Sequence, residues 1–536
     1  MLKSDYQCIT CGDGISIHRF GAEENSNLIE LNGHSILIDC HTSELNAEIK
    51  NRNLPMPEII LHTHVAPEHC CEGNSFRDAV IRVPQGLEAL ASDPAKYREL
   101  TATVWDKPEK WMDTMGRETY GVAGCTTFFP PAIPLVLGES LLADHSFSWN
   151  NLSIDVIALP AHGCFSIGFI INQNGNAVAF FPGDLFHHPS SLVNMYELVT
   201  NYGGTCIEQL PLLLRKVSTI GTKFFLPSTG DIINDGPADA EELATKIEDY
   251  LNSLAWKSGH FTPGLEVKGA EAGAFIKVAD GIYQDKGFGN TIILIDEKGR
   301  GLVIDPGPCG YGSDILLSHR EAEFSNSLDF LENEEGLKTI ELMLITHMHG
   351  DHYDMVPLLQ RRYGAKLASW HKIAEIIENP EAYPYSCLMP WYNLGINGIN
   401  VDYHLQLGIG FEWNGIAVEV IHLPGHSYAH CGYIFDFRGE RLAITGDTIQ
   451  SRGDSCSLDF IITNDSDPFS AGILHALQNL CDKNITLNLG GHGSRFRECN
   501  DMYKESILRV QKALDSLKKL LTGKNYHKLF HAPNMR

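Results

Sequence analysis

Residues 345–352 read Ile-Thr-His-Met-His-Gly-Asp-His. The residues before them, 342–345, are apolar and strand-like, so the imidazoles are expected to begin where a strand ends. Side chains two apart on an extended chain point the same way, which turns His347 and His349 toward one point. The glycine lets the chain turn and aim the carboxylate and third imidazole at a neighbouring point. This stretch therefore predicts ligands for two adjacent metal positions, with zinc favoured and iron or manganese as alternatives.

Three more candidate ligands follow, each in a glycine-containing turn at the expected end of a strand. They are His426, Asp447 and His492. One histidine after a glycine is more often a cap or a surface residue. In this order, however, the three complete two ligand sets.

Over residues 265–500 this order of ligands resembles the metallo-β-lactamase superfamily, whose motifs are Asp, HxHxDH, His, Asp and His. The resemblance implies an αββα sandwich with two metals at one edge, between the sheets. It implies a first metal on His347, His349 and His426, and a second on Asp351, His352 and His492. It also implies that Asp447 bridges the two metals and that Asp305 orients ligands from an outer shell.

The implied activity is that of a dinuclear metallohydrolase, in which a bridging hydroxide attacks the substrate. Asp351 is the candidate catalytic residue that accepts or relays a proton. The polar side chains nearest the ligands in sequence are candidates for substrate binding: Arg495, Tyr353 and Tyr428. The sequence departs from the family pattern in two ways. A Gly-Gly pair is missing after the octet, and extra residues lie between Asp305 and His347.

The chain contains an internal repeat. Residues 147–162 match residues 411–426 without a gap at an offset of 264, and eight of the sixteen positions are identical. Alternating β-branched and helical stretches indicate α/β layering in each copy. The expected fold is therefore α/β, with two tandem αββα metallo-β-lactamase-like sandwiches. The expected boundaries are a degenerate domain at 1–255, a linker at 256–264, and an intact catalytic domain at 265–536 that ends in a helix.

The first copy has a damaged ligand set. Aligning Thr63 with Thr346 places His64 on His347, Glu68 on Asp351 and His69 on His352. It also puts Ala66 on His349 and Thr229 on the last histidine, so each metal position loses a ligand. This register predicts a half that packs, shapes the other pocket or binds a ligand. A second register instead matches His62 and His64 with the first two histidines of the octet. That register predicts a residual single-metal site formed by His62, His64, His162 and Asp184.

Composition limits the function. The formal net charge is −26, which argues against a nucleic-acid partner and favours a small-molecule substrate. The N-terminus lacks an apolar signal region, and no run of about 18 apolar residues occurs, so a cytoplasmic protein without a membrane partner is expected. The fourteen cysteines are scattered and predict reduced thiols, and Cys8 and Cys11 are given no function. Homo-oligomer formation stays open.

Three function classes remain. The first is a hydrolase of small-molecule thioester, lactone or related ester bonds. The second is a nuclease or RNA-processing phosphodiesterase, since a degenerate half followed by an active half is also the layout of long transfer-RNA 3′-processing enzymes. The third is an iron-dependent oxidoreductase or a metal-dependent sensor on the same scaffold. Charge favours the first class.

Overall fold

The computed structural model describes residues 6–21, 24–42, 44–65, 69–70, 73–93, 109–112, 118–121, 134–160, 165–186, 188–192, 209–254, 267–286, 291–307, 317–380, 398–452, 455–456 and 467–521. The chain divides into two compact units. Unit 1 comprises Met1–Ser253 and Asp515–Leu529, and unit 2 comprises Leu254–Leu514 and Phe530–Arg536. The predicted linker at 256–264 lies outside the described residues.

The first sheet of unit 2 contains eight strands in chain order. They are β14 (Ala270–Ala272), β15 (Phe275–Ala279), β16 (Ile282–Asp285), β17 (Ile292–Ile295), β18 (Arg300–Ile304), β19 (Thr339–Ile345), β20 (Lys366–Trp370) and β21 (Tyr403–Leu405). Neighbours are antiparallel up to β18 and parallel from β18 onward. Parallel neighbours need crossover connections, which contain α6 (Leu317–Glu334), α7 (Val356–Tyr363) and α8 (His371–Glu378). The ends of β18 and β19 therefore meet at one edge of the sheet.

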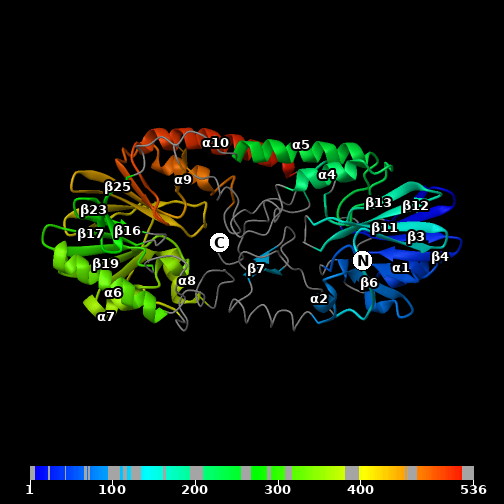
Figure 1. The fold of residues 1–536 in the computed structure, drawn as a ribbon, viewed down its shortest axis with the longest axis horizontal. Coiled ribbons are helices and arrows are strands. Elements are labelled where there is room, and N and C mark those ends of the chain that lie inside the picture. Colours follow the sequence, from blue (N-terminus) through cyan, green and yellow to red (C-terminus); the bar gives the residue numbers. More distant parts are fainter. Residues whose placement is uncertain are drawn as a thin grey trace. The chain divides into compact units, whose positions relative to one another are not determined.

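The second sheet of unit 2 has six strands in order along the chain. They are β22 (Phe411–Trp413), β23 (Ile416–His422), β24 (Cys431–Phe437), β25 (Glu440–Gly446), β28 (Leu487–Gly490) and β29 (Arg495–Phe496). A short hairpin, β26 (Ser451–Arg452) and β27 (Ser455–Cys456), and two helices, α9 (Ile473–Leu480) and α10 (Cys499–Leu520), complete this part. Helices α7 and α8 contact the first sheet and α9 contacts the second, which gives helix, sheet, sheet and helix layers (Figure 1).

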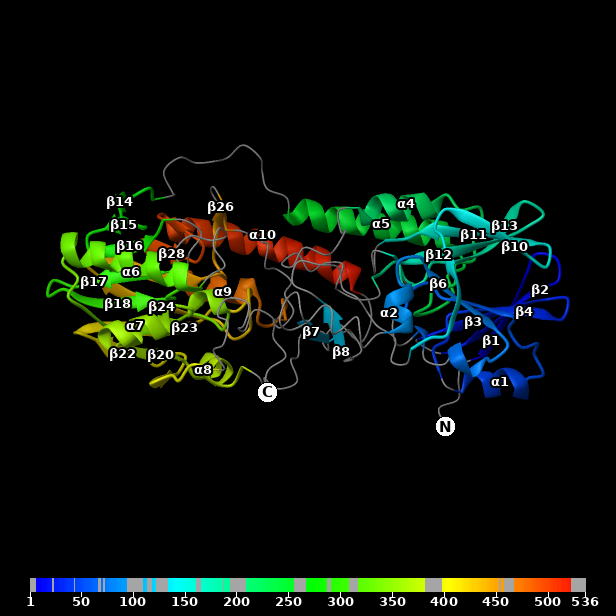
Figure 2. The same ribbon diagram turned by 60° about the horizontal axis from the view of Figure 1, so that its bottom comes forward.

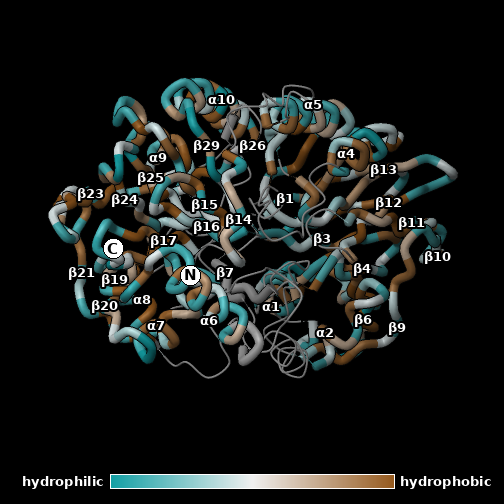
Figure 3. The backbone as a smooth tube through the Cα atoms, turned by 60° about the vertical axis from the view of Figure 1, so that its left-hand side comes forward, coloured by the Kyte–Doolittle hydropathy of each residue, from teal (hydrophilic) through white to brown (hydrophobic). Residues whose placement is uncertain are grey.

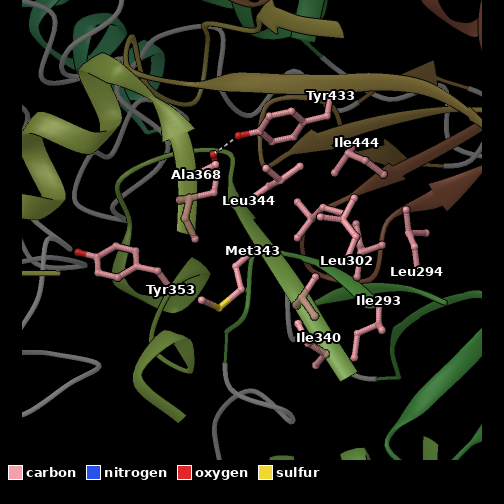
Figure 4. Packing of buried hydrophobic residues seen from close by; sticks show 14 of the residues in the cluster. Ile293, Leu294, Leu302, Ile340, Met343, Leu344, Tyr353, Ala368, Tyr433 and Ile444 are labelled. Atoms are coloured by element: carbon pink, nitrogen blue, oxygen red, sulfur yellow. Dashed lines mark hydrogen bonds between the residues drawn. The ribbon is translucent and has the colours of Figure 1, made fainter. Parts of the chain in front are cut away.

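A large apolar cluster in unit 2 includes side chains from both sheets. Its members in β17, β18 and β19 are buried, as expected for central strands of a sheet that is covered on both faces. Figure 4 shows part of this packing, with Leu344 of β19 on the side of Tyr433 and Ile444 and Met343 on the opposite side of the strand, toward Tyr353. The hydroxyl of Tyr433 donates a hydrogen bond of 2.7 Å to the carbonyl of Ile345, which fixes the end of β19.

Unit 1 also contains two sheets. The first is β1 (Tyr6–Cys11), β2 (Ile15–Phe20), β3 (Ser26–Leu31), β4 (His34–Ile38), β5 (Ile59–Leu61), β6 (Val80–Pro84) and β9 (Leu137–Leu141), and the second is β10 (His145–Trp149), β11 (Leu152–Ala158), β12 (Ile167–Gln173) and β13 (Asn176–Phe181). Its helices are α1 (Leu45–Asn51), α2 (Glu88–Ser92), α4 (Leu210–Ser218) and α5 (Gly236–Leu254), and β7 (Glu109–Met112) pairs with β8 (Glu118–Gly121) (Figure 2). One apolar cluster joins the two sheets, and a second lies under α1 and α2.

The order of strands in the first sheet is similar in the two units. In each, antiparallel strands lead into parallel ones, at β4 to β5 in unit 1 and β18 to β19 in unit 2. Figure 3 shows hydrophobic stretches along β11 and β12, whereas α5 and α10 carry both hydrophilic and hydrophobic residues, as expected for helices with one buried face. The predicted α/β class and sandwich architecture are confirmed. Among the described helices, none combines the length and apolar character needed to span a membrane.

Candidate metal centre

Four of the predicted ligands follow directly from the end of β19. The chain leaves the strand at Ile345, and residues Gly350–His352 form one short 3-10 turn, η4. His347 pairs with His430 in an isolated antiparallel bridge that holds the start of this loop against the start of β24. All four ligand side chains are buried, so the loop presents them inside the protein rather than to solvent.

One group of three imidazoles consists of His347, His349 and His426, whose ligand atoms all lie within 4.8 Å of one another. Nε2 of His426 lies 2.8 Å from Nδ1 of His349. The ring centroids of His347 and His349 are 4.6 Å apart. The structure therefore brings together the three residues predicted to hold the first metal.

A second group consists of Asp351, His352 and His492, again with ligand atoms within 4.8 Å of one another. Nε2 of His352 and Nε2 of His492 both lie 3.7 Å from Oδ2 of Asp351. His492 has a φ of 51°, a strained conformation for a residue with a side chain, and such strain is often stored at functional sites. These are the three residues predicted for the second metal.

Asp447 lies between the two groups. Its Oδ2 is 3.0 Å from Nε2 of His492 and 3.6 Å from Nε2 of His426, while its Oδ1 is 3.3 Å from Nε2 of His352. The same carboxylate thus reaches a member of the first group and two members of the second. That position fits the bridging role predicted for it.

Asp305 lies behind the ligands. Its carboxylate accepts hydrogen bonds from the backbone N–H and the hydroxyl of Thr346, each at 2.7 Å, and lies 3.0 Å from Nδ1 of His352. The Thr346 hydroxyl is in turn 3.2 Å from Nδ1 of His347. Asp305 follows β18 with a φ of 49°, so a strained residue fixes the rings of two ligands.

His430 is a residue of this site that the sequence reasoning missed. Its Nε2 accepts a hydrogen bond of 3.2 Å from the backbone N–H of Asp447, and its ring stacks on His347 with centroids 4.8 Å apart. The residue before Asp447 must be glycine, because a Cβ on Gly446 would lie 2.7 Å from Nε2 of His430 and would also clash with Thr346. A histidine four residues after His426 was the only signal in the sequence.

Burial keeps the first group of imidazoles neutral. It lowers the pKa of His347 and of His426 well below the ordinary value and lowers the pKa of His349 to about 4. The same desolvation lowers the pKa of His430 to about 3, so this ring remains an acceptor for the Asp447 N–H. Neutral imidazole is the form that binds a metal ion, so these three histidines are in the protonation state that coordination requires.

The second group has the opposite balance. Burial disfavours the charged form of His492, but Asp447 and Asp351 outweigh it and raise the pKa to about 9. The pKa of His352 is raised well above its ordinary value, since Asp447, Asp351 and Asp305 overcome the effect of burial. The buried carboxylates thus stabilise positive charge on the two imidazoles. A bound cation would provide that charge in place of the protons.

The donor set fits a metal ion. Among the described residues, Nε2 of the fully buried His347 has no hydrogen-bond partner, while its Nδ1 is occupied by Thr346. A buried polar nitrogen without a partner is costly, and coordination would satisfy it. Imidazole and carboxylate ligands, oriented from behind by a carboxylate, are typical of zinc and related transition metals.

The three predicted substrate-binding residues differ in their surroundings. Tyr353 is fully buried and belongs to the apolar cluster of unit 2, an environment that argues against contact with substrate (Figure 4). Arg495 donates hydrogen bonds to the carbonyls of Val267 and Gly493, at 2.6 and 3.2 Å, and its substrate role stays a prediction. Tyr428 is half-buried beside His422, and its substrate role stays a prediction.

Unit 1 carries a smaller cluster at the corresponding strand ends. His64, His69 and Asp184 are buried, and their ligand atoms lie within 4.8 Å of one another. The predicted partner His62 instead lies 3.7 Å from Asp39 and 3.5 Å from the sulfur of Cys70, so its assignment to this site is corrected to His69. The predicted ligand His162 lies outside the described residues.

Hydrogen bonds identify how the loop after β5 in unit 1 aligns with the loop after β19 in unit 2. Asp39 accepts from the backbone N–H and the hydroxyl of Thr63, at 2.9 and 2.8 Å, as Asp305 does from Thr346. This pattern matches His64 with His347, in the first of the two predicted registers. The register that matched His62 with His347 is therefore wrong. The hydrogen bonds of Asp39 to Thr63 make Thr63 the equivalent of Thr346, and the next residue, His64, is then the equivalent of His347.

Comparison with known proteins extends these observations. The family model of the metallo-beta-lactamase superfamily matches residues 285–510. A stretch of 175 residues is 29% identical to an atrochrysone carboxyl ACP thioesterase of Passalora fulva, and covers 32% of this chain and 42% of that protein. Another stretch of 168 residues is 29% identical to a hydroxyacylglutathione hydrolase of Aeromonas salmonicida, and covers 31% of this chain and 48% of that protein. The chain thus spans less than half the length of either relative.

Solved metallo-beta-lactamase structures align with part of this chain. A metallo-beta-lactamase motif mutant from Cronobacter sakazakii aligns with a TM-score of 0.30 and 17% identity, over 45% of this chain and 93% of that one. The family match includes the octet, His426, Asp447 and His492. Residues 285–510 are thus similar to the metallo-beta-lactamase superfamily.

Proposed function

We propose that unit 2 is a dinuclear metallohydrolase that cleaves a thioester or related ester bond of a small molecule. The observation that supports this most strongly is the pair of ligand groups on either side of Asp447. Zinc is the proposed metal, with iron or manganese as alternatives. When bound, two such cations would act as Lewis acids and lower the pKa of a water molecule, so that a nucleophile is available at neutral pH.

The side chains of unit 2 have separate tasks in this proposal. The neutral His347, His349 and His426 would hold the first metal, and Asp351, His352 and His492 the second, while Asp447 would contact both. Asp305 and His430 are positioning residues, since they act through Thr346 and through the backbone of Asp447. Asp351 is proposed to accept the proton that the water molecule releases. Its Oδ2 lies within the second ligand group, 3.7 Å from Nε2 of both His352 and His492.

The choice of a thioester rests on similarity and on charge. One relative is named a carboxyl ACP thioesterase and another a hydroxyacylglutathione hydrolase, and both names describe the release of an acyl group from sulfur. The formal charge of −26 opposes the approach of a polyanionic nucleic acid. Thioester hydrolysis therefore takes precedence over phosphodiester cleavage on this chain.

A substrate panel tests the proposal. The full chain would be assayed with an S-acyl glutathione, an acyl-phosphopantetheine thioester, a lactone and bis(p-nitrophenyl) phosphate. We expect kcat/KM for the better thioester to exceed that for the phosphodiester by at least about tenfold, a difference of ~1.4 kcal/mol in transition-state binding. A phosphodiester that reacts faster than both thioesters would contradict the proposal and favour a nuclease. A protein that hydrolyses none of the four while consuming oxygen would favour an oxidoreductase.

We also propose that the two units descend from one duplicated domain. The shared strand order and the identical contacts of Asp39 with Thr63 and of Asp305 with Thr346 support this. An experimental structure in which the loops after β5 and β19 followed different paths would contradict it.

A further inference from the structure

We propose that unit 1 binds one divalent metal ion through His64, His69 and Asp184. This site would be additional to the two metals proposed for unit 2 and does not depend on hydrolysis by that unit. The three residues come from two loops. His64 and His69 follow β5 of the first sheet, and Asp184 follows β13 of the second, so one ion would join the two sheets of unit 1.

The spacing of the three side chains suits coordination. Nε2 of His69 lies 2.9 Å and Nε2 of His64 lies 3.6 Å from Oδ2 of Asp184. The two imidazole rings are tilted, with centroids 4.6 Å apart. Metal–ligand bonds of about 2.0–2.2 Å place neighbouring ligand atoms roughly 3–3.6 Å apart, so little movement is needed to admit an ion.

Hydrogen bonds orient one of these ligands, His64, from behind. The hydroxyl of Thr63 lies 3.0 Å from Nδ1 of His64, which leaves Nε2 as the nitrogen directed at Asp184. Asp39 holds Thr63 and also accepts a hydrogen bond of 2.5 Å from the hydroxyl of Ser228. A buried carboxylate that fixes the ring of a histidine through its neighbour is typical of a metal site.

The site would hold one ion rather than two. Asp184 occupies the position that Asp447 has in unit 2, but its other oxygen accepts a hydrogen bond of 2.9 Å from the hydroxyl of Thr229. In unit 2 the equivalent contact to Asp447 comes from the imidazole of His492, a predicted metal ligand. A threonine hydroxyl is a poor ligand for such ions, so unit 1 keeps a part of each ligand group and combines the two parts.

Two imidazoles and one carboxylate suit Zn²⁺, Fe²⁺ or Mn²⁺, and leave other coordination positions open. Without an ion, the same residues would form a buried His69–Asp184 ion pair. The two alternatives differ in the amount of metal that the chain binds, because only the proposed site adds a third equivalent to the two in unit 2.

The test is the zinc content of the full-length protein after dialysis against Zn²⁺ and removal of free ion, measured by inductively coupled plasma mass spectrometry. We expect Asp184→Asn, which keeps the size of the side chain, and His69→Ala each to bind one equivalent less than wild type. Asp13→Asn, an exposed aspartate of the same unit, would serve as the matched control and should keep the full content.

Equal zinc content in wild type, Asp184→Asn and His69→Ala would overturn the proposal and leave the ion pair. Circular dichroism would establish that each variant is folded, and if His69→Ala were not, the isosteric Asp184→Asn would decide the question. Failure of unit 2 to bind metal would lower the content of all four proteins alike. The difference between wild type and Asp184→Asn would still report on unit 1 alone.

Discussion

Replacing Asp447 with alanine is expected to lower kcat/KM of the hydrolase by about 10³-fold, which corresponds to ~4 kcal/mol of lost transition-state stabilisation. The reason is the place of this carboxylate, which lies 3.0–3.6 Å from His492, His352 and His426 and so serves both ligand groups. Its loss would also leave the imidazoles of the second group without their nearest anion. Both metal positions would weaken together.

The measurement combines steady-state kinetics with metal content. Asp436→Ala is the matched control, since Asp436 lies in β24 of the same sheet but its side chain is 74% exposed and pairs with Arg441. We expect the control to keep wild-type kinetics and metal content. If Asp447→Ala kept wild-type activity, or lost activity while retaining all of its metal, the bridging role would be refuted.

Replacing Leu344 with alanine is expected to reduce the free energy of unfolding of unit 2 by about 2–5 kcal/mol. Leu344 is fully buried in β19, and Figure 4 shows it facing Tyr433 and Ile444 of the second sheet. Its neighbours on the parallel strands, Ile304 and Ala368, are held by the sheet register and cannot close the space. The lost apolar contacts and the remaining cavity both contribute to the cost.

This effect should be measured by urea unfolding of metal-free protein, because a bound ion would add its own stabilisation. Leu508→Ala is the control, as Leu508 lies in α10 with 71% of its surface exposed, and we expect a change within about 0.5 kcal/mol. A cost below about 1 kcal/mol for Leu344→Ala would mean that the cavity is filled by rearrangement, against the close packing described.

The ligand groups were predictable because the sequence placed each ligand at a strand end. The period of β-strands gave the directions of His347 and His349, and glycine-containing turns marked His426, Asp447 and His492. The structure brings these five together with Asp351 and His352. Local sequence thus indicated a metal site, while the division of these ligands into two groups came from the resemblance to the family.

Other features required the three-dimensional structure. Tyr353 and Arg495 adjoin ligands in sequence, yet one faces the apolar core and the other faces the backbone of Val267. Closeness along the chain does not give the direction of a side chain after a turn. His430 was missed for the converse reason, because its partner is the backbone of Asp447, seventeen positions away.

The register of the loop after β5 was also beyond the sequence. Both registers offered two histidines, and the choice between His62 and His69 as the partner of His64 depended on a long-range contact. Asp39 lies 24 positions before Thr63, and its two hydrogen bonds fix which residue starts the loop. The sequence contained both residues but did not show that they meet.

The central claim is that metal held by unit 2 performs the hydrolysis, and removal of metal tests it most directly. The wild-type protein would be treated with a chelator until mass spectrometry detects no zinc, iron or manganese, and its hydrolysis of the preferred thioester would be compared before and after readdition of Zn²⁺. We predict that hydrolysis by wild type falls to the uncatalysed rate when metal is removed. Readdition of Zn²⁺ should restore it in wild type but should not produce it in His349→Ala. Metal-free protein that hydrolysed the thioester at its original rate would contradict the claim.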